Sequence, residues 1–86
     1  MYLKEEKVKS VTSSIESFVV RTHQPCEYVF NEAIDPRTHK PLRLMFYPLG
    51  NNKFSLSRGR NNILDSAKLE SCVSVALAIV EAVKAQ

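Results

Sequence analysis

The chain has 86 residues, of which 44% are hydrophobic and 24% charged, and these ordinary globular values argue against wholesale disorder. This length predicts one domain over residues 1–86, near the lower limit of what a single core can stabilise. No apolar stretch is long enough to span a membrane, and two cysteines are too few for a secreted disulfide framework. We therefore expect a cytoplasmic protein in which Cys26 and Cys72 are reduced.

The first predicted element is a helix from Tyr2 to about Arg21. Its apolar residues recur three or four positions apart, with polar residues between them on a solvent-facing side. They are Val8, Val11, Ile15, Phe18 and Val19. We expect the helix to end before Pro25, because the residue that precedes a proline is disfavoured in the α conformation.

Three strands follow, at residues 26–34, 42–47 and 53–58, where aromatic and β-branched residues or strict alternation dominate. The segments DPRTHKP and PLGNN between them predict turns. Alternation along the strands separates an apolar face from a mixed face of cations, Met45 and Tyr47. The apolar face has Leu42, Leu44, Phe46, Phe54 and Leu56; the other has Arg43, Met45, Tyr47, Lys53, Ser55 and Ser57.

The last predicted element is a helix that begins near Asp65 or Ser66, either of which can cap it. A broad apolar stripe runs along this helix, and Leu77 is expected on the opposite side among charged residues. The fold class is therefore α+β, in the order α-β-β-β-α. We expect a three-stranded antiparallel meander with both helices packed on one face.

This order of elements resembles that of double-stranded RNA-binding domains, which carry a lysine cluster at the start of the second helix. Here the corresponding stretch LDSAKLESC has the single Lys68, followed by Glu70. The order of elements alone does not specify a function, so the residues do not identify the chain as a member.

Charge is distributed unevenly along the chain, although the net charge is only +3. Residues 36–64 contain six basic side chains and no acid, whereas the rest of the chain carries six basic and nine acidic side chains. Such asymmetry indicates a polyanionic or acidic partner. SRGRNN in this window is expected to lead into the N-terminus of the second helix, which would favour anions further.

The uncovered face of the sheet combines cations with an aromatic ring, as proteins that bind single-stranded nucleic acid do. We therefore predict a small nucleic-acid-binding accessory domain, with single strands favoured. The alternative is a protein-interaction module, such as an adaptor, inhibitor or small chaperone, that binds an acidic protein surface or adds a partner strand to the sheet edge. The predicted binding residues are Arg37, Lys40, Arg43, Tyr47, Lys53, Arg58 and Arg60.

The small size and the wide apolar stripe also predict a homodimer. Its interface is expected on the last helix, at Val75, Leu77, Ala78 and Ala82.

No enzymatic activity, cofactor or metal is predicted. The sequence lacks a nucleophile-elbow, phosphate-loop or zinc-protease motif. Glu27 and Glu32 are five residues apart, so a regular strand would place them on opposite faces, where they could not act as an acid–base pair. The possible metal ligands do not follow a known zinc spacing; they are His23, Cys26, His39 and Cys72.

Overall fold

A computed structural model of the protein describes the backbone of residues 2–86 and the side chains of residues 5–86. Two helices flank a run of four strands, and the connections between elements are short. The elements are α1 (Tyr2–Thr22), β1 (Cys26–Asp35), β2 (Lys40–Gly50), β3 (Lys53–Arg58), β4 (Asn61–Lys68) and α2 (Leu69–Lys84).

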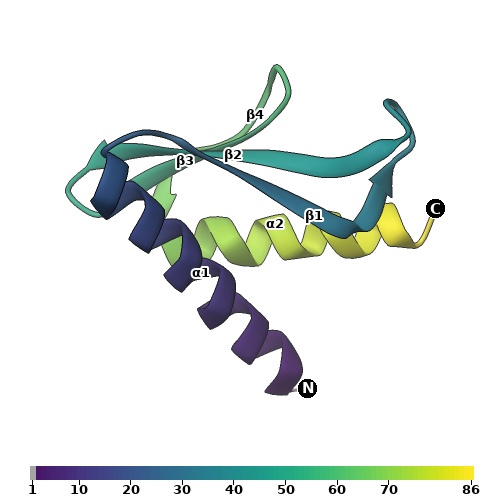
Figure 1. Cartoon of the computed structure of the whole chain (residues 1–86), viewed down its shortest axis with the longest axis horizontal. Helices are drawn as coiled ribbons and strands as arrows, with labels where there is room; N and C mark the ends of the chain where they lie inside the picture. The colour runs from purple at the N-terminus through teal and green to yellow at the C-terminus, as the bar shows by residue number, and fades with distance from the viewer. Residues whose placement is uncertain (1) are drawn as a thin grey trace.

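The strands form one antiparallel sheet in the order β1-β2-β3-β4, and both helices lie on the same side of it (Figure 1). The α+β class and the antiparallel sheet are confirmed. The prediction of three strands was wrong, because residues 61–68 form a fourth strand where we expected a loop and the start of the last helix.

The irregular pairing of β4 with β3 explains why the sequence pattern did not predict β4 as a strand. Its register shifts twice, between the Phe54 and Leu56 pairs and again between the Leu56 and Ser57 pairs. Each shift changes which β4 side chains face the core, so the apolar residues of NNILDSAK do not alternate as they would in a regular strand. Asp65, whose capping tendency suggested a helix start, instead accepts a hydrogen bond from the side chain of Asn62.

The N-terminus of α2 has no side-chain cap. The N-cap position is occupied by Lys68, which has an extended backbone and makes no capping hydrogen bond. Lys68 also lies directly opposite Lys53 in the sheet. A cation is unfavourable both beside the positive end of the helix and opposite another cation.

Replacing Lys68 with aspartate is therefore expected to raise the free energy of unfolding by about 0.5–2 kcal/mol, since it supplies a cap. For a domain of this size the melting temperature should rise by roughly 4–8 °C per kcal/mol. Thermal unfolding followed by circular dichroism measures the change. Ser66→Ala is the control and should alter stability by less than about 0.5 kcal/mol. A destabilising Ser66→Ala together with a neutral Lys68→Asp would place the helix start back at Ser66.

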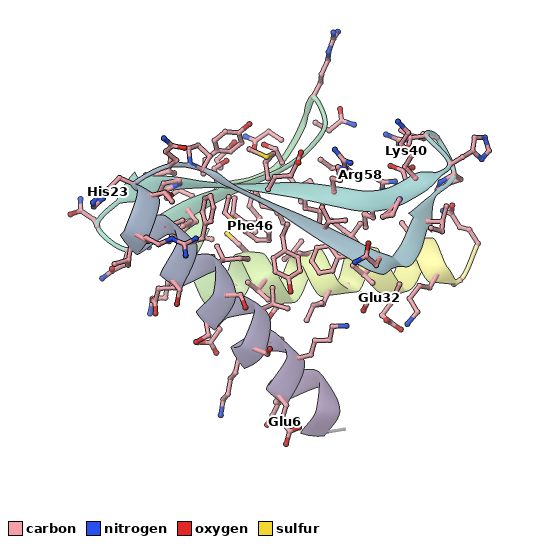
Figure 2. All side chains as sticks on the ribbon, in the orientation of Figure 1. Glu6, His23, Glu32, Lys40, Phe46 and Arg58 are labelled. Carbon is pink, nitrogen blue, oxygen red and sulfur yellow. The ribbon has the colours of Figure 1, made fainter. Side chains whose placement is uncertain are left out.

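The core lies between the sheet and the two helices, and it confirms the predicted alternation. Leu42, Leu44, Phe46 and Leu56 are completely buried. In Figure 2, Phe46 points from β2 toward α2, whereas Lys40 and Arg58 lie on the side of the sheet away from the helices. The helix-facing and open faces of β2 and β3 are therefore those that the sequence predicted.

The placement of Leu77 was wrong, because this side chain is only 6% exposed and belongs to the core. Leu77 joins a core cluster that contains residues of α1 and of the sheet as well as of α2, and α1 packs beside α2 (Figure 1). Leu77 is therefore not a surface residue of the monomer. Val75 is half-buried and Ala78 and Ala82 are exposed, so the dimer surface stays a prediction resting on these three residues.

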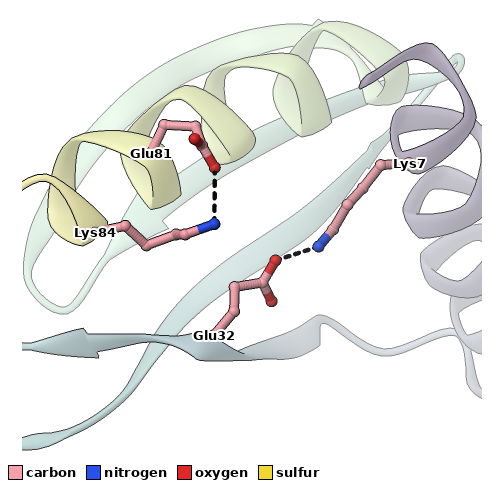
Figure 3. A network of polar contacts seen from close by, with 4 residues as sticks. All are labelled: Lys7, Glu32, Glu81 and Lys84. Carbon is pink, nitrogen blue, oxygen red and sulfur yellow. Dashed lines mark hydrogen bonds and ion pairs between the residues drawn. The ribbon is translucent and has the colours of Figure 1, made fainter. Parts of the chain in front are cut away.

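An ion pair joins α1 to the sheet on the helix-facing side. Lys7 of α1 donates to Glu32 of β1, close to the neighbouring pair Lys84–Glu81 on α2 (Figure 3). The hydrogen bond from Lys7 lowers the pKa of Glu32, against the opposing effect of burial. Neither described helix combines the length and apolarity needed to cross a bilayer.

Candidate anion-binding groove

The face of the sheet that the helices leave uncovered is hollowed into an open groove of about 730 Å³, here called the basic groove. The ends of β1 and β3, the middle of β2 and two turns contribute its walls. Its lining residues are Glu27, Asp35, Arg37, Thr38, Lys40, Pro41, Arg43, Met45, Tyr47, Arg58, Gly59, Arg60 and Asn61. Five of these side chains are cations and two are acids, so the groove has an excess of positive charge.

Six of the seven predicted binding residues line this one groove. They are Arg37, Lys40, Arg43, Tyr47, Arg58 and Arg60. The seventh, Lys53, begins β3 beside the turn that joins β2 to β3, and it is not part of the groove lining. Residues that are up to 23 positions apart in the chain are thus brought together because β1, β2 and β3 are consecutive strands of the sheet.

The turn between β1 and β2 presents Arg37 and leads into Lys40. The carbonyl of Asp35 accepts backbone hydrogen bonds from Thr38 and His39, at 3.2 and 2.8 Å. His39 has a left-handed backbone, with φ of +60°, which lets the chain reverse into β2. The predicted DPRTHKP turn is therefore confirmed, and its hydrogen bonds define where its cations lie.

The turn between β3 and β4 consists of Gly59 and Arg60. Gly59 has φ of +59°, the positive value that the first position of a two-residue type II′ hairpin requires. The expectation that SRGRNN leads into a helix N-terminus was wrong, because the chain enters β4 instead. The N-terminus of α2 lies at the far end of β4, about 20–25 Å along the strand, and cannot contribute its dipole to the groove.

Asp35, which the sequence analysis did not predict, holds Arg58 at the groove. Arg58 Nη2 donates to Asp35 Oδ1 at 3.3 Å, and the two side chains are only 21% and 13% exposed. A second donor, the backbone N–H of Arg37, contacts the same oxygen at 2.9 Å.

These contacts set the ionisation of Asp35. The Arg37 N–H, and secondarily the charge of Arg58, lower the pKa of Asp35, although burial opposes them. A lowered pKa in the folded protein means that the carboxylate stabilises the fold fully above the usual value of 3.8. That contribution is lost as the pH falls through the folded pKa.

The second missed acid is Glu27, which pairs more loosely with Arg43. Glu27 Oε1 lies 3.8 Å from Arg43 Nη1, and both side chains are about half exposed. Alternation along β1 could have predicted that Glu27 lies on the open face, because Glu27 is paired with Met45 of β2 and the two side chains share that face. Asp35 precedes the acid-free window by one residue, so the turn brings it back among the window's arginines. An acid-free stretch of sequence is thus not an acid-free surface.

The other three cations of the groove are exposed side chains. Among the side chains that the structure describes, no carboxylate lies within ion-pair distance of Arg37, Lys40 or Arg60, and all three are exposed. Glu32 is not among the groove-lining residues and pairs with Lys7 of α1, whereas Glu27 lines the groove.

Metal-ligating residues do not gather anywhere in the described part of the chain. Among the side chains of residues 5–86 there is no group of three or more His, Cys, Asp or Glu residues that could hold a metal ion. Both cysteines are free and buried, and burial raises the pKa of the Cys26 and Cys72 thiols.

Comparisons of the chain with protein-family models, with curated proteins and with solved structures find no match. A function for this protein therefore has to be inferred from the basic groove itself.

Proposed function

We propose that the basic groove binds single-stranded nucleic acid. The observation that carries this proposal is the convergence of five cations and the ring of Tyr47, from two turns and two strands, on one groove. Proteins that bind single strands combine a positive groove along the phosphates with aromatic side chains for the bases.

Three exposed cations and Tyr47 have distinct roles in this proposal. The guanidinium groups of Arg37 and Arg60 can each donate two hydrogen bonds to one phosphate, while Lys40 contributes a point charge. Tyr47, which is 37% exposed, offers its ring for stacking on a base. A volume of about 730 Å³ is that of a small-ligand site, so it suits one or two nucleotides rather than a duplex.

Fluorescence anisotropy with labelled oligonucleotides tests the proposal. If three phosphates are neutralised by Arg37, Lys40 and Arg60, affinity for a single strand should fall with salt with a log–log slope of about −2. Raising the salt from 50 to 200 mM should then weaken binding roughly 20-fold. A duplex of the same length should bind more weakly. If no oligonucleotide binds micromolar protein at 50 mM salt, the proposal is wrong.

Arg60→Ala should reduce the magnitude of the salt slope by about 0.7, since one phosphate contact is lost. Lys9→Ala is the matched control, because it removes the same charge from an exposed position on α1, outside the groove lining. Equal effects of the two variants would show that net charge, rather than the groove, governs binding.

A protein partner would give a different result. If poly-glutamate displaced the labelled oligonucleotide as effectively as an unlabelled single strand of matched charge, an acidic protein surface would be the expected ligand of the groove.

A further inference from the structure

The contact between Asp35 and Arg58 joins parts of the sheet that are not neighbours. Asp35 ends β1 and Arg58 ends β3, with β2 between these strands. Neighbouring strands lie about 4.8 Å apart, so the arginine side chain must reach over β2 to meet the carboxylate. The oxygen that receives it also holds the backbone of the β1–β2 turn at Arg37. One atom thus connects the two cation-bearing turns.

We propose that Asp35 is a positioning residue for anion binding, an inference that rests on the proposed function of the groove. The negative charge of Asp35 by itself would repel a bound phosphate and weaken binding. As an anchor, Asp35 orders Arg58 and the Arg37 turn before the ligand arrives, so less conformational freedom is lost on binding. The low exposure of the pair, 13% and 21%, indicates that it is ordered, unlike the exposed pair of Glu27 and Arg43.

The two roles predict opposite effects of one substitution. Asp35→Asn removes the negative charge, but the asparagine oxygen can still accept the Arg37 N–H and keep the turn. If Asp35 acted only as a charge, this variant would bind single strands more tightly. If Asp35 positions Arg58, the variant should bind about 3- to 10-fold more weakly despite its more positive groove.

Glu27→Gln is the matched control. It removes the same charge from the same groove and breaks only the 3.8 Å contact of Glu27 with Arg43. We expect binding to be unchanged or up to about fivefold tighter. Weaker binding by Asp35→Asn without weaker binding by Glu27→Gln, measured by anisotropy with a labelled oligothymidine at 50 mM salt, would support the proposal.

Two further variants separate positioning from a general loss of structure. In an Arg58→Ala background, Asp35→Asn should no longer weaken binding, because the side chain that it positions is absent. Arg58→Lys keeps the charge but not the planar fork, so we expect weaker binding, whereas a purely electrostatic role predicts no change. Melting temperatures of all variants show whether they are folded at the assay temperature.

The outcomes distinguish this inference from the function on which it rests. If the unaltered protein binds no oligonucleotide, the proposed function is wrong. If it binds and Asp35→Asn tightens binding as Glu27→Gln does, the groove keeps its function and the positioning role of Asp35 is overturned. An Asp35→Asn effect that persists in the Arg58→Ala background would also overturn it.

Discussion

Replacing Phe46 with alanine is expected to lower the free energy of unfolding by about 3–5 kcal/mol, the range found for buried aromatic residues. The side chain is completely buried, and it lies opposite Cys26 on β1 and Leu56 on β3, so its removal leaves a cavity at the centre of the sheet's apolar face. A loss of this size is a large fraction of the roughly 5–15 kcal/mol that stabilises ordinary domains. Urea unfolding followed by circular dichroism measures it.

Tyr47→Ala provides the control for this prediction within the same strand. Tyr47 is the next residue along β2, but it points into the open groove and is 37% exposed. Its removal should therefore cost much less stability than the removal of Phe46. Similar losses for the two variants would contradict the assignment of the two faces of the sheet.

Tyr47→Ala should instead weaken the binding of single-stranded oligonucleotides by about 5- to 150-fold, which corresponds to the 1–3 kcal/mol of one stacked base. Tyr47→Phe keeps an aromatic face and should bind nearly as the unaltered protein does. The measurement is the anisotropy titration described for the groove, at one fixed salt concentration. The salt slope should stay the same, since no phosphate contact is removed.

A polyanion without bases separates the contribution of base stacking from that of the phosphate contacts. Inorganic polyphosphate can contact Arg37, Lys40 and Arg60 but cannot stack on Tyr47, so Tyr47→Ala should leave its binding unchanged. If Tyr47→Ala affected neither ligand, the ring would have no role in binding and the acidic-protein alternative would gain support.

The sequence predicted those parts of the fold where one residue's environment follows from its immediate neighbours. Alternation assigned Phe46 to the core and Arg43 and Tyr47 to the open face, and proline, glycine and asparagine located the turns between the strands. These features depend on local backbone geometry, in which successive strand side chains point to opposite faces. Arg43 and Tyr47 of the groove followed from this alternation, whereas Arg37, Lys40, Arg58 and Arg60 were predicted from the acid-free window of sequence in which they lie.

The features that were missed depend on contacts between distant segments. The bulges of β4 mask its alternation, and only its pairing with β3 shows that it is a strand. Leu77 is buried in a core cluster that residues from both helices and the sheet form together. The place of Asp35 in the groove depends on a side chain that reaches across an intervening strand from Arg58. Such contacts cannot be obtained from the periodicity of one segment, because they depend on how the segments pack.

The irregular pairing of β1 with β2 and of β4 with β3 affects how the sheet edges can associate with other chains. These two strands are the edges of the sheet, and the register shifts in both, between Phe30 and Ile34 in β1 and at two positions in β4. A bulged edge offers an incoming strand an interrupted row of hydrogen-bonding groups, which disfavours strand addition and edge-to-edge aggregation. We therefore expect the chain to remain dispersed at concentrations where a flat four-stranded sheet would assemble into fibres.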